Sequence, residues 1–498
     1  MKKEDDLESP LLPDGKPAPP SPPAAKGCSA YALVCALLAS LTSIIYGYNR
    51  GVMSGAQKYV QADLGVSDGQ LEVLIGATSV YSLVGSLAAG WTCDRAGRRR
   101  AVAISAAMFL AGSAVTAAAD GYAALMAGQL VAGVACGFGL VVAPVYIAEI
   151  APAGSRGFLS SIPEIAGNSG ILLSYIADFA LAGLPTGINW RLMIGIGAVP
   201  PLFLAAAAVL AMPETPRWLV LHGHPDEARR VLARTSGAAD ADRRLMEILT
   251  SVKNNAGAGA VDSPPPPTSV WREILLRPTP AVRRVMLAIV GLQVFQQACG
   301  VAALVLYAPR VFGHAGVTSV LGATVLLGAV KTVAIVVPLF LADRLGRRPM
   351  LLASAGGMAA SLLVLGLSMS MPASSSWAEA TCVAAAASFM AAFSLGFGPV
   401  IWMYGSEILP LRLRAQGTGI GTAVNRVMSA LVGMTFISMY EAVGMAGSFY
   451  IFAAMSAAAW VFVYACLPET KGRSLEEMEE LFDNAGADKA SSPRAALS

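Results

Sequence analysis

Apolar residues fall into twelve long runs along the chain, and polar or charged residues gather between them. A helix needs about 20 predominantly apolar residues to cross the hydrocarbon core of a bilayer. The runs, with ragged ends, lie near 31–52, 71–91, 101–119, 122–147, 158–180, 190–212, 285–307, 318–342, 350–371, 378–404, 415–439 and 446–467. The pattern therefore predicts an all-α membrane protein with twelve transmembrane helices in two sets of six.

Positive charge is distributed unevenly over the connections between these runs. The connections after the second, fourth, sixth, eighth and tenth runs carry nearly all the Lys and Arg, whereas the alternate connections carry little more than Lys58 and Arg310. Short loops rich in Lys and Arg stay in the cytoplasm. We therefore expect both termini and the long connection after the sixth run to be cytoplasmic.

Three regions outside the runs complete the organisation of the chain. The N-terminal segment is charged and proline-rich, which is typical of a disordered tail and unlike a signal peptide. Charged and apolar positions alternate from Pro225 to Val252, which predicts short amphipathic helices. The expected divisions are a tail at 1–30, a six-helix half at 31–212, a loop at 213–284, a second half at 285–467 and a tail at 468–498.

Composition narrows the class of function. Hydrophobic residues make up 55% of the chain and charged residues 13%, about half the charged share of a soluble protein. The net charge of +3 is too small to suggest nucleic acid, and the seven cysteines are scattered without metal-ligand spacing. No Ser-His-Asp, metal or phosphate-loop arrangement occurs, and none of the three histidines falls in an apolar run. We therefore expect neither an enzyme nor a cofactor.

Three charged patterns recur at an offset of about 250 residues, each after an even-numbered run. The pairs are Asp94 to Arg99 with Asp343 to Arg348, Glu149-x-x-Pro152-x-x-x-Arg156 with Glu407-x-x-Pro410-x-x-x-Arg414, and Pro213-Glu214-Thr215 with Pro468-Glu469-Thr470. Parallel repeats of this kind are how alternating-access transporters build a substrate site between two halves. The repeats therefore predict two halves of one topology.

The repeated charges suit a cytoplasmic gate, because opposite charges at helix ends can join when that side is shut and separate when it opens. A single cluster would equally suit charges that only set the topology. Three patterns duplicated in register favour the gate. The expected gate residues are Asp94, Arg98, Glu149, Arg156, Glu214, Asp343, Arg347, Glu407, Arg414 and Glu469.

These patterns resemble the sugar porter family of the major facilitator superfamily over about residues 30–480. The further matches are Pro213 to Leu219, Trp190-Arg191, Gln296-Gln297 and Gly396 to Trp402, and similarity to the plant polyol/monosaccharide branch lies in Trp271 to Glu273, Pro278 to Arg284 and Ser161 to Gly170. The resemblance implies the major facilitator fold, with two pseudo-symmetric halves. It also implies proton-driven symport of a polyol or monosaccharide at the plasma membrane. One pair of halves encloses one path, so a monomer should suffice.

Polar residues inside the fifth run are candidates for the substrate site, because ionisable groups are costly in a membrane. Glu164, Asn168, Tyr175 and Asp178 fall within about 80° of one helical face. Sugar porters place a substrate-binding Gln where Glu164 stands, and the polyol branch resembles this chain in having Glu. We expect Glu164 and Asn168 to bind hydroxyl groups. The alternative is a carboxylate that is simply solvated near the cytoplasmic mouth.

The seventh run carries a second polar stripe. Gln293, Gln297, Gly300 and Tyr307 share one face by the same helical arithmetic, with Gln296 beside them. The family resemblance implies that Gln296 and Gln297 grip sugar hydroxyls. Hydrogen bonding between helices is the plainer interpretation, but two adjacent glutamines in lipid are costly enough to favour binding.

Three further residues of the C-terminal half join the predicted site. Lys331 could pair with Glu164 or donate directly to the substrate. The resemblance implies that Trp402 stacks on the C–H face of the sugar, although a single Trp in lipid could equally be packing. Asn425 is a weaker candidate of the same kind.

The chain departs from the family where proton coupling is expected. Sugar porters that carry protons have an Asp in the first run and an Arg in the fourth, and here these positions hold Asn49 and Gln129, which cannot titrate. Arg50 adds a cation to the first run, for which we expect Glu164 as the partner. Ala302 stands where sugar porters carry Asn or Asp.

Several functions therefore stay open. The protein could be a facilitative uniporter, or Glu164 could take over proton binding, so that protons are a possible co-substrate. It could be a carrier that has drifted and transports poorly. A non-transporting sugar sensor is the rival from another class, disfavoured by tails of about thirty residues. A channel fits the paired charges of both halves less well than alternating access does.

Overall fold

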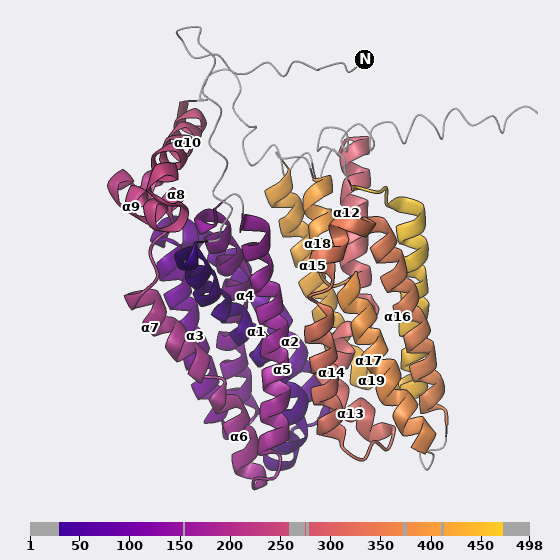
Figure 1. Cartoon of the computed structure of the whole chain (residues 1–498). Coiled ribbons are helices and arrows are strands. Elements are labelled where there is room, and N and C mark those ends of the chain that lie inside the picture. Colours follow the sequence, from indigo (N-terminus) through magenta and orange to yellow (C-terminus); the bar gives the residue numbers. More distant parts are fainter. Residues whose placement is uncertain are drawn as a thin grey trace, which may run out of the picture.

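The computed structural model describes residues 29–152, 155–257, 274, 278–371, 376–409 and 413–471. Helices make up most of this part of the chain, and turns or short loops join them. Figure 1 shows two bundles standing side by side, one from residues 30–210 and the other from residues 280–466. The predicted all-α architecture of two six-helix halves is confirmed. Of the predicted tails, only residues 29–30 and 468–471 belong to the described residues.

The N-terminal half contains seven helices. They are α1 (Ala30–Leu64), α2 (Asp68–Ala96), α3 (Arg98–Ala117), α4 (Tyr122–Ile150), α5 (Arg156–Leu181), α6 (Thr186–Ile196) and α7 (Val199–Leu210). A capping box starts α2, because the Ser67 hydroxyl accepts from the N–H of Gln70 and the Gln70 side chain accepts from that of Ser67. The sixth predicted run is split into α6 and α7, since prolines begin the second piece.

Glycines let α1 and α5 pack backbone to backbone. A Cβ on Gly47 would lie 1.9 Å from the carbonyl oxygen of Gly167, and one on Gly170 would lie 2.1 Å from that of Ile44. In a membrane, helices gain from such close packing because lipid gives no hydrophobic drive between them. The α1–α5 pair therefore positions the residues of both helices that face the second half.

The helices of the C-terminal half are interrupted more often than those of the N-terminal half. They are α12 (Pro280–Ala298), α13 (Val301–His314), α14 (Val320–Ala334), α15 (Pro338–Leu345), α16 (Arg347–Met369), α17 (Ser376–Leu395), α18 (Val400–Ile408) and α19 (Arg414–Cys466). The last joins two predicted runs across Gly444, whose φ is +78°. In the described part of the chain, ten segments are long and apolar enough to span a membrane, and α5, which carries two acidic residues, is not among them.

The seventh run breaks at Gly300, where φ is +86°. That left-handed conformation suits glycine, and it ends the regular turn of α12. The predicted stripe is therefore wrong beyond this point. Tyr307 lies in non-helical geometry within α13, is fully buried, and donates its hydroxyl to the carbonyl of Gly433 at 2.6 Å.

Two more predicted spans are interrupted. The eighth run is divided between α14 and α15 just before Pro338, and the tenth is divided at residues 396–399, between α17 and α18. A helix break leaves carbonyl groups without intrahelical partners. Irregular backbone at membrane depth is tolerated where protein or a water-filled cavity satisfies it.

Three helices follow the N-terminal half, and the second and third lie where the sequence predicted amphipathic helices, between Pro225 and Val252. They are α8 (Pro216–Leu221), α9 (Pro225–Ser236) and α10 (Ala238–Gly257). Arg229 on α9 pairs with Asp242 on α10 at 2.5 Å, and Arg244 donates to the carbonyl of Ala151 at the end of α4. Figure 1 shows these helices beyond one end of the N-terminal bundle.

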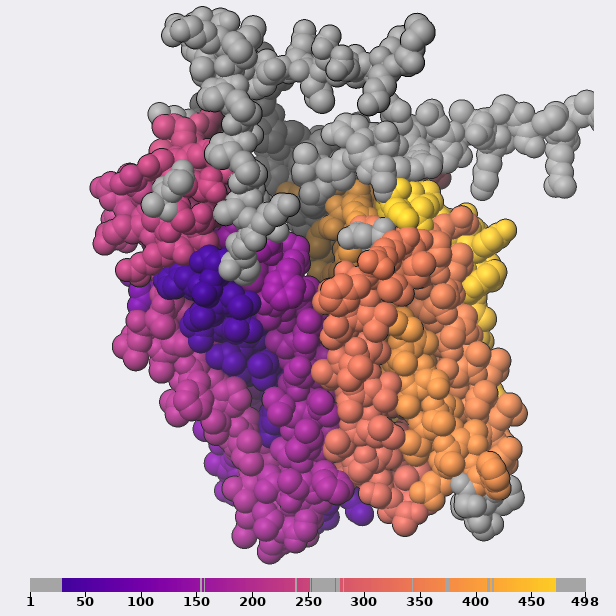
Figure 2. All heavy atoms as spheres, viewed as in Figure 1, coloured from indigo at the N-terminus to yellow at the C-terminus, as the bar shows by residue number. Residues whose placement is uncertain are grey.

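Contacts between the halves concentrate away from the end that bears α8 to α10. At the opposite end Arg310 donates to Asp68 at 2.7 Å, and the Ser438 hydroxyl donates to Glu72 at 2.6 Å. At the α8–α10 end, the hydrogen bonds and ion pairs that join described residues stay within one half. Figure 2 shows the two halves as separate bodies meeting along one seam. The structure is thus closed across one end of that seam.

Candidate functional site

A cavity of about 330 Å³ lies between the two halves. Helices α1, α4 and α5 line it from one side, and α12, α13, α14, α17, α18 and α19 line it from the other. Pro144 and Pro163, which interrupt the hydrogen bonding of α4 and α5, both face it. Its volume is at the lower end of the range for small-molecule sites, which is about 300–1,000 Å³.

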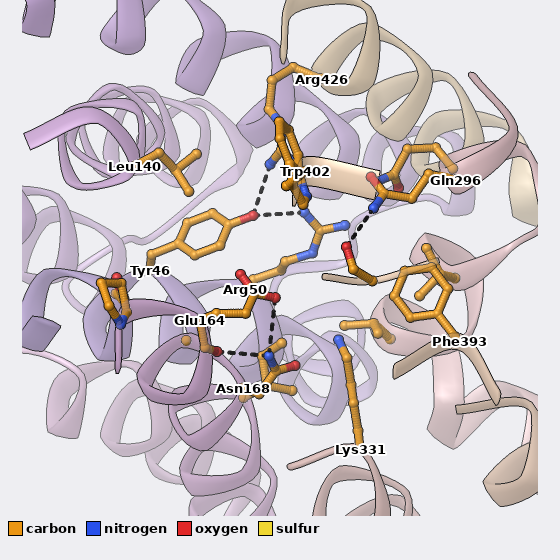
Figure 3. Close-up of a pocket in the computed structure, with 18 of the residues that line it drawn as sticks. Tyr46, Arg50, Leu140, Glu164, Asn168, Gln296, Lys331, Phe393, Trp402 and Arg426 are labelled. Atoms are coloured by element: carbon orange, nitrogen blue, oxygen red, sulfur yellow. Dashed lines mark hydrogen bonds between the residues drawn. The ribbon is translucent and has the colours of Figure 1, made fainter. Parts of the chain in front are cut away.

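Six of the seven residues that the sequence proposed for substrate binding line this cavity. They are Glu164, Asn168, Gln296, Gln297, Lys331 and Trp402. Figure 3 shows five of them converging on one space from different helices. The seventh, Asn425, is fully buried behind the cavity wall. The polar residues of widely separated runs are thus brought to one place.

Asn425 holds the two cavity glutamines in position. Its amide nitrogen donates to Gln296 at 2.5 Å and to Gln293 at 2.8 Å, and its carbonyl oxygen accepts from Gln297 at 3.2 Å. Each of these bonds joins α12 to α19. Asn425 therefore positions the candidate ligand-binding glutamines and does not itself line the cavity.

The break between α17 and α18 anchors Gln296. Its amide nitrogen donates to the carbonyl oxygens of Phe397 at 2.6 Å and Gly398 at 3.1 Å. These carbonyls belong to the interrupted stretch and therefore need a partner. Gln297 differs, because its buried side-chain oxygen has no hydrogen-bond partner in the described part of the chain. That oxygen is an acceptor for a hydroxyl group.

Glu164 and Asn168 form one wall of the cavity on α5. The Asn168 amide donates to the Glu164 backbone carbonyl at 2.8 Å and reaches its carboxylate at 3.5 Å. The Glu164 side chain is exposed to the cavity space. Thr332 of α14 donates to the Asn168 carbonyl at 3.2 Å, so this wall is tied to the second half.

Arg50 does not form the predicted ion pair with Glu164. Within the described residues, no carboxylate lies within 4.0 Å of its guanidinium. Arg50 instead donates to the hydroxyls of Tyr46 and Ser429, each at 3.1 Å. The predicted ion pair is therefore wrong: the guanidinium is held by two hydroxyl groups, one of them on Tyr46, a helical turn away on α1.

Two cavity residues were missed by the sequence reasoning. Arg426, on α19, donates to the Tyr46 hydroxyl at 2.9 Å and to Asn425 at 2.6 Å. An arginine within an apolar run was a usable signal, because such a charge is rare without a function. Tyr46 carried a weaker signal, as it lies four residues before Arg50 and hence on the same face of α1.

Lys331 does not form an ion pair with Glu164, one of the two partners considered for it. No ion pair within 4.0 Å joins it to Glu164, and its ammonium group makes no hydrogen bond to the described residues. Figure 3 shows that group pointing into the open space of the cavity, on the side opposite Tyr46. Trp402, from α18, is partly exposed to the same space.

The two uncharged coupling positions lie outside the main cavity. The Asn49 side-chain oxygen accepts from the thiol of Cys136 at 3.7 Å, and the Gln129 oxygen accepts from the Thr78 hydroxyl at 3.3 Å. Asn49 lines a small adjoining void of about 20 Å³. Among the described residues, the hydrogen bonds of both side chains are made to uncharged partners.

The predicted gate charges form one cluster in each half, with repeated geometry. Arg98 pairs with Glu149 at 3.0 Å and with the largely exposed Asp94 at 3.5 Å. Arg347 pairs with Glu407 at 2.7 Å. The side chains of Arg156, Asp343 and Arg414 lie outside the described residues. The charges that the structure places are thus joined within halves rather than between them.

A carboxylate caps the helix that follows each cluster. Glu214 accepts from the backbone N–H groups of Arg98 and Arg99, and Glu469 accepts from those of Arg347 and Arg348. Negative charge is favourable at such helix N-termini. Burial raises the pKa of Glu214, against the backbone donors. Burial acts in the same direction on Glu469, but four backbone N–H groups hold its pKa below the ordinary value.

Glycine makes this cap possible in both halves. Gly97 and Gly346 have φ of +92° and +95°, and a Cβ on either would collide with the capping carboxylate. The matched backbone, cap and ion pair extend the sequence repeat to three dimensions.

Known proteins share both the sequence and the fold. Residues 35–482 match the family described as "Sugar (and other) transporter". Polyol transporter 5 of Arabidopsis thaliana is 46% identical over 475 residues, which cover 91% of this chain and 86% of that protein. The inward open conformation of the xylose transporter XylE from E. coli aligns at 24% identity with a TM-score of 0.76, covering 90% of this chain and 99% of XylE. XylE bound to 6-bromo-6-deoxy-D-glucose, described as a proton:xylose symporter, aligns at 25% identity with a TM-score of 0.72, covering 92% and 100%.

Proposed function

The chain belongs to the sugar (and other) transporter family, and from this premise we propose facilitative transport of a polyol or monosaccharide through the central cavity, without proton coupling. As a member of this family, the chain is an integral, multi-pass membrane protein that transports sugars or polyols and is not an enzyme. The proposal adds the mode of transport and the path.

The path is supported by the position of the cavity between two halves that touch mainly at one end. Positive charge favours a cytoplasmic location for the α8–α10 end, so the conformation is inward-facing. The Arg310–Asp68 and Ser438–Glu72 bonds then close the outer side. Alternating access follows when the halves rock about the cavity. A monomer at the plasma membrane is the simplest form of this carrier.

The clusters around Arg98 and Arg347 are proposed as the inner gate. In an inward-facing carrier these charges pair within their own halves, as they do here. Closure of the inner side would bring the two clusters together and allow pairing between halves. The matched helix caps at Glu214 and Glu469 would keep both clusters rigid during that movement.

One observation supports transport without proton coupling: the two positions where proton symporters of the family hold charged residues are occupied here by uncharged side chains. Asn49 and Gln129 cannot exchange protons, and their partners, Cys136 and Thr78, are uncharged residues. A symporter needs a group that binds a proton in one state and releases it in another. Glu164 is the remaining carboxylate of the cavity and is therefore the alternative proton carrier.

The test is uptake of labelled sorbitol, myo-inositol and glucose by yeast that lacks its own hexose carriers. Uptake is measured at acidic and neutral external pH, with and without a protonophore. Facilitative transport predicts uptake that does not respond to the protonophore and does not accumulate solute above the external concentration. Uptake that rises at acidic pH and collapses with the protonophore would overturn the absence of coupling.

Two variants sharpen the result. Glu164→Gln removes the alternative proton carrier but keeps hydrogen bonding, so residual uptake should keep the same indifference to pH. Gln296→Ala removes an anchored cavity amide and should reduce uptake by about tenfold, since a hydrogen bond of this kind contributes about 1 kcal/mol or more. Absence of uptake for all three solutes, with the protein at the cell surface, would favour a sensor or a carrier that has lost activity.

A further inference from the structure

The central cavity carries more positive than negative charge. Among the described residues that line it, Arg50, Lys331 and Arg426 are cationic and Glu164 is the one acid. A neutral polyol needs hydrogen-bond donors and acceptors, but it does not need a formal excess of two positive charges. We propose that the preferred solute is a polyol or monosaccharide that bears a carboxylate, namely a sugar acid. This inference rests on the proposed transport through the same cavity.

The two guanidinium groups are satisfied by neutral oxygens alone. Arg50 donates to Tyr46 and Ser429, each at 3.1 Å, and Arg426 donates to the same Tyr46 hydroxyl at 2.9 Å and to Asn425 at 2.6 Å. No carboxylate of the described chain lies within 4.0 Å of either group. Their hydrogen bonds are therefore mostly made, while neither charge has a carboxylate of the described chain in direct contact.

Burial makes that uncompensated charge costly. Arg426 is 7% exposed, and its Nε has no hydrogen-bond partner among the described residues. Charged groups inside a membrane pair with each other, with water or with a substrate. Because two cations share one hydroxyl at this point, repulsion between them adds to the cost. An anion placed there would remove both contributions.

The cavity also offers acceptors for hydroxyl groups. The Gln297 oxygen is buried with no partner among the described residues, and the Glu164 carboxylate is exposed to the cavity. Both accept hydrogen bonds from hydroxyls. The ammonium group of Lys331 points into the same space and can donate to a hydroxyl or a carboxylate (Figure 3). One solute can therefore place its acid group against the arginines and its hydroxyls against these acceptors.

The cations come from both halves of the protein. Arg50 lies on α1 and Arg426 lies on α19, and Figure 3 shows the two side chains meeting around Tyr46. A carboxylate between them would hold the two halves together at the cavity, which is what a substrate does when it promotes closure. The volume of about 330 Å³ restricts the site to a small solute.

The experiment uses the purified full chain in proteoliposomes. Initial uptake is measured for labelled gluconate and glucuronate, and for sorbitol and glucose as neutral counterparts of similar size. We expect kcat/KM for the acids to exceed that for the neutral solutes by about tenfold or more, because a charged partner strengthens the hydrogen bonds of the arginines. A potential that is positive inside should speed uptake of the acids and leave sorbitol unchanged, because only the acids carry charge.

Variants at one position separate charge from packing. Arg50→Met should remove about tenfold of the preference for acids, whereas Arg50→Lys should retain most of it. Should Arg50→Met fail to fold, Lys331→Met offers the same comparison from another helix. Loss of the preference with Arg50→Met and its return with Arg50→Lys would support an electrostatic role.

The outcomes are distinguishable. Uptake of sorbitol or glucose at least equal to that of the acids would overturn this inference and leave the proposed transport intact. Glucose 6-phosphate is measured in the same assay, and a preference for it over gluconate would also overturn the inference, since the site would then select a phosphate ester. No uptake of any solute by folded protein would overturn the proposed function and this inference with it.

Discussion

The bond network of Arg310 offers a direct test of how the closed end is held. Arg310 lies on α13, and its guanidinium donates to Asp68 at 2.7 Å, to Gln61 at 2.5 Å and to Tyr440 at 3.1 Å. The first two acceptors belong to the N-terminal half, so these bonds cross between halves. Arg310→Gln removes the charge and shortens the reach of the side chain. We expect this change to shift the resting population toward the state that is open at this end.

The size of the shift follows from the exposure of the pair. The side chain of Arg310 is 20% exposed and that of Asp68 is 46% exposed, so solvent screens much of their attraction. An exposed ion pair contributes about 1 kcal/mol or less, and the bond to Gln61 adds about 0.5–1 kcal/mol. The total of about 1–2 kcal/mol corresponds to a roughly 5- to 30-fold change in the ratio of the two conformations.

Hydrogen–deuterium exchange of the purified protein measures this shift. The loops at 65–67 and 315–319, at the closed end, should exchange faster in Arg310→Gln, and a competing solute that holds the inner side open should slow them again. Arg191→Gln is the matched control, because the Arg191–Asp63 pair at 2.6 Å lies within one half. Exchange that is unchanged in Arg310→Gln, or raised equally in the control, would refute the assignment of this pair to the outer gate.

Two further predictions concern the stability of the N-terminal half. Gly47→Ala should lower the thermal unfolding midpoint in detergent, because its Cβ would meet the Gly167 carbonyl oxygen at 1.9 Å. Overpacking of this kind costs about 1–3 kcal/mol. Gly90→Ala is the control and should leave the midpoint unchanged, because a Cβ there meets nothing within 4 Å. Asp178→Asn should raise the midpoint, by a gain of about 1 kcal/mol in the free energy of unfolding, because an unpaired buried charge is costly. The Asp178 carboxylate is 1% exposed and accepts one backbone N–H, that of Gly55, at 3.1 Å. Its other oxygen has no partner in the described chain. Asp120→Asn at the surface is its control, and a fall in the midpoint of Asp178→Asn would contradict the reasoning.

Apolar run length and charge were sufficient to predict the architecture. Each of the first ten runs forms a helix or a pair of helices, and the last two lie within α19 on either side of Gly444, since a bilayer admits few other ways of satisfying the backbone. The repeat of Asp94 to Arg99 at Asp343 to Arg348 also predicted that the halves would resemble each other. The structure extends that likeness to the caps at Glu214 and Glu469.

Helix breaks were the part of the fold that hydropathy could not locate. The left-handed backbone at Gly300 depends on the packing of Phe452, which a Cβ there would meet at 2.6 Å. A pattern based on 100° per residue continues through such a residue without warning. The stripe from Gln293 to Tyr307 therefore held only as far as the end of α12.

The sequence predicted which residues line the candidate site, but it did not predict which of them interact with one another. Arg50 was expected beside Glu164, and Lys331 was expected to pair with Glu164 or to donate to the substrate, yet neither cation forms an ion pair with Glu164 within 4.0 Å. The lining residues could be predicted because polar groups are costly in lipid, so that polar residues within apolar runs are candidates for a functional site. Pairing depends on side-chain directions fixed by several helices at once, and a shared hydroxyl such as that of Tyr46 leaves no trace in the sequence pattern.

The main-chain anchoring of Gln296 has a consequence for how this carrier can change over evolutionary time. Its amide is held by the carbonyl oxygens of Phe397 and Gly398, and every amino acid provides a carbonyl oxygen. Exchanges of the side chain at position 397 would therefore leave the grip on Gln296 in place. In the proposed site, discrimination between solutes would depend on residues such as Arg50 and Lys331, which make no hydrogen bond to Gln296. A new specificity is then within reach of single substitutions, and the scaffold that presents it is inherited unchanged.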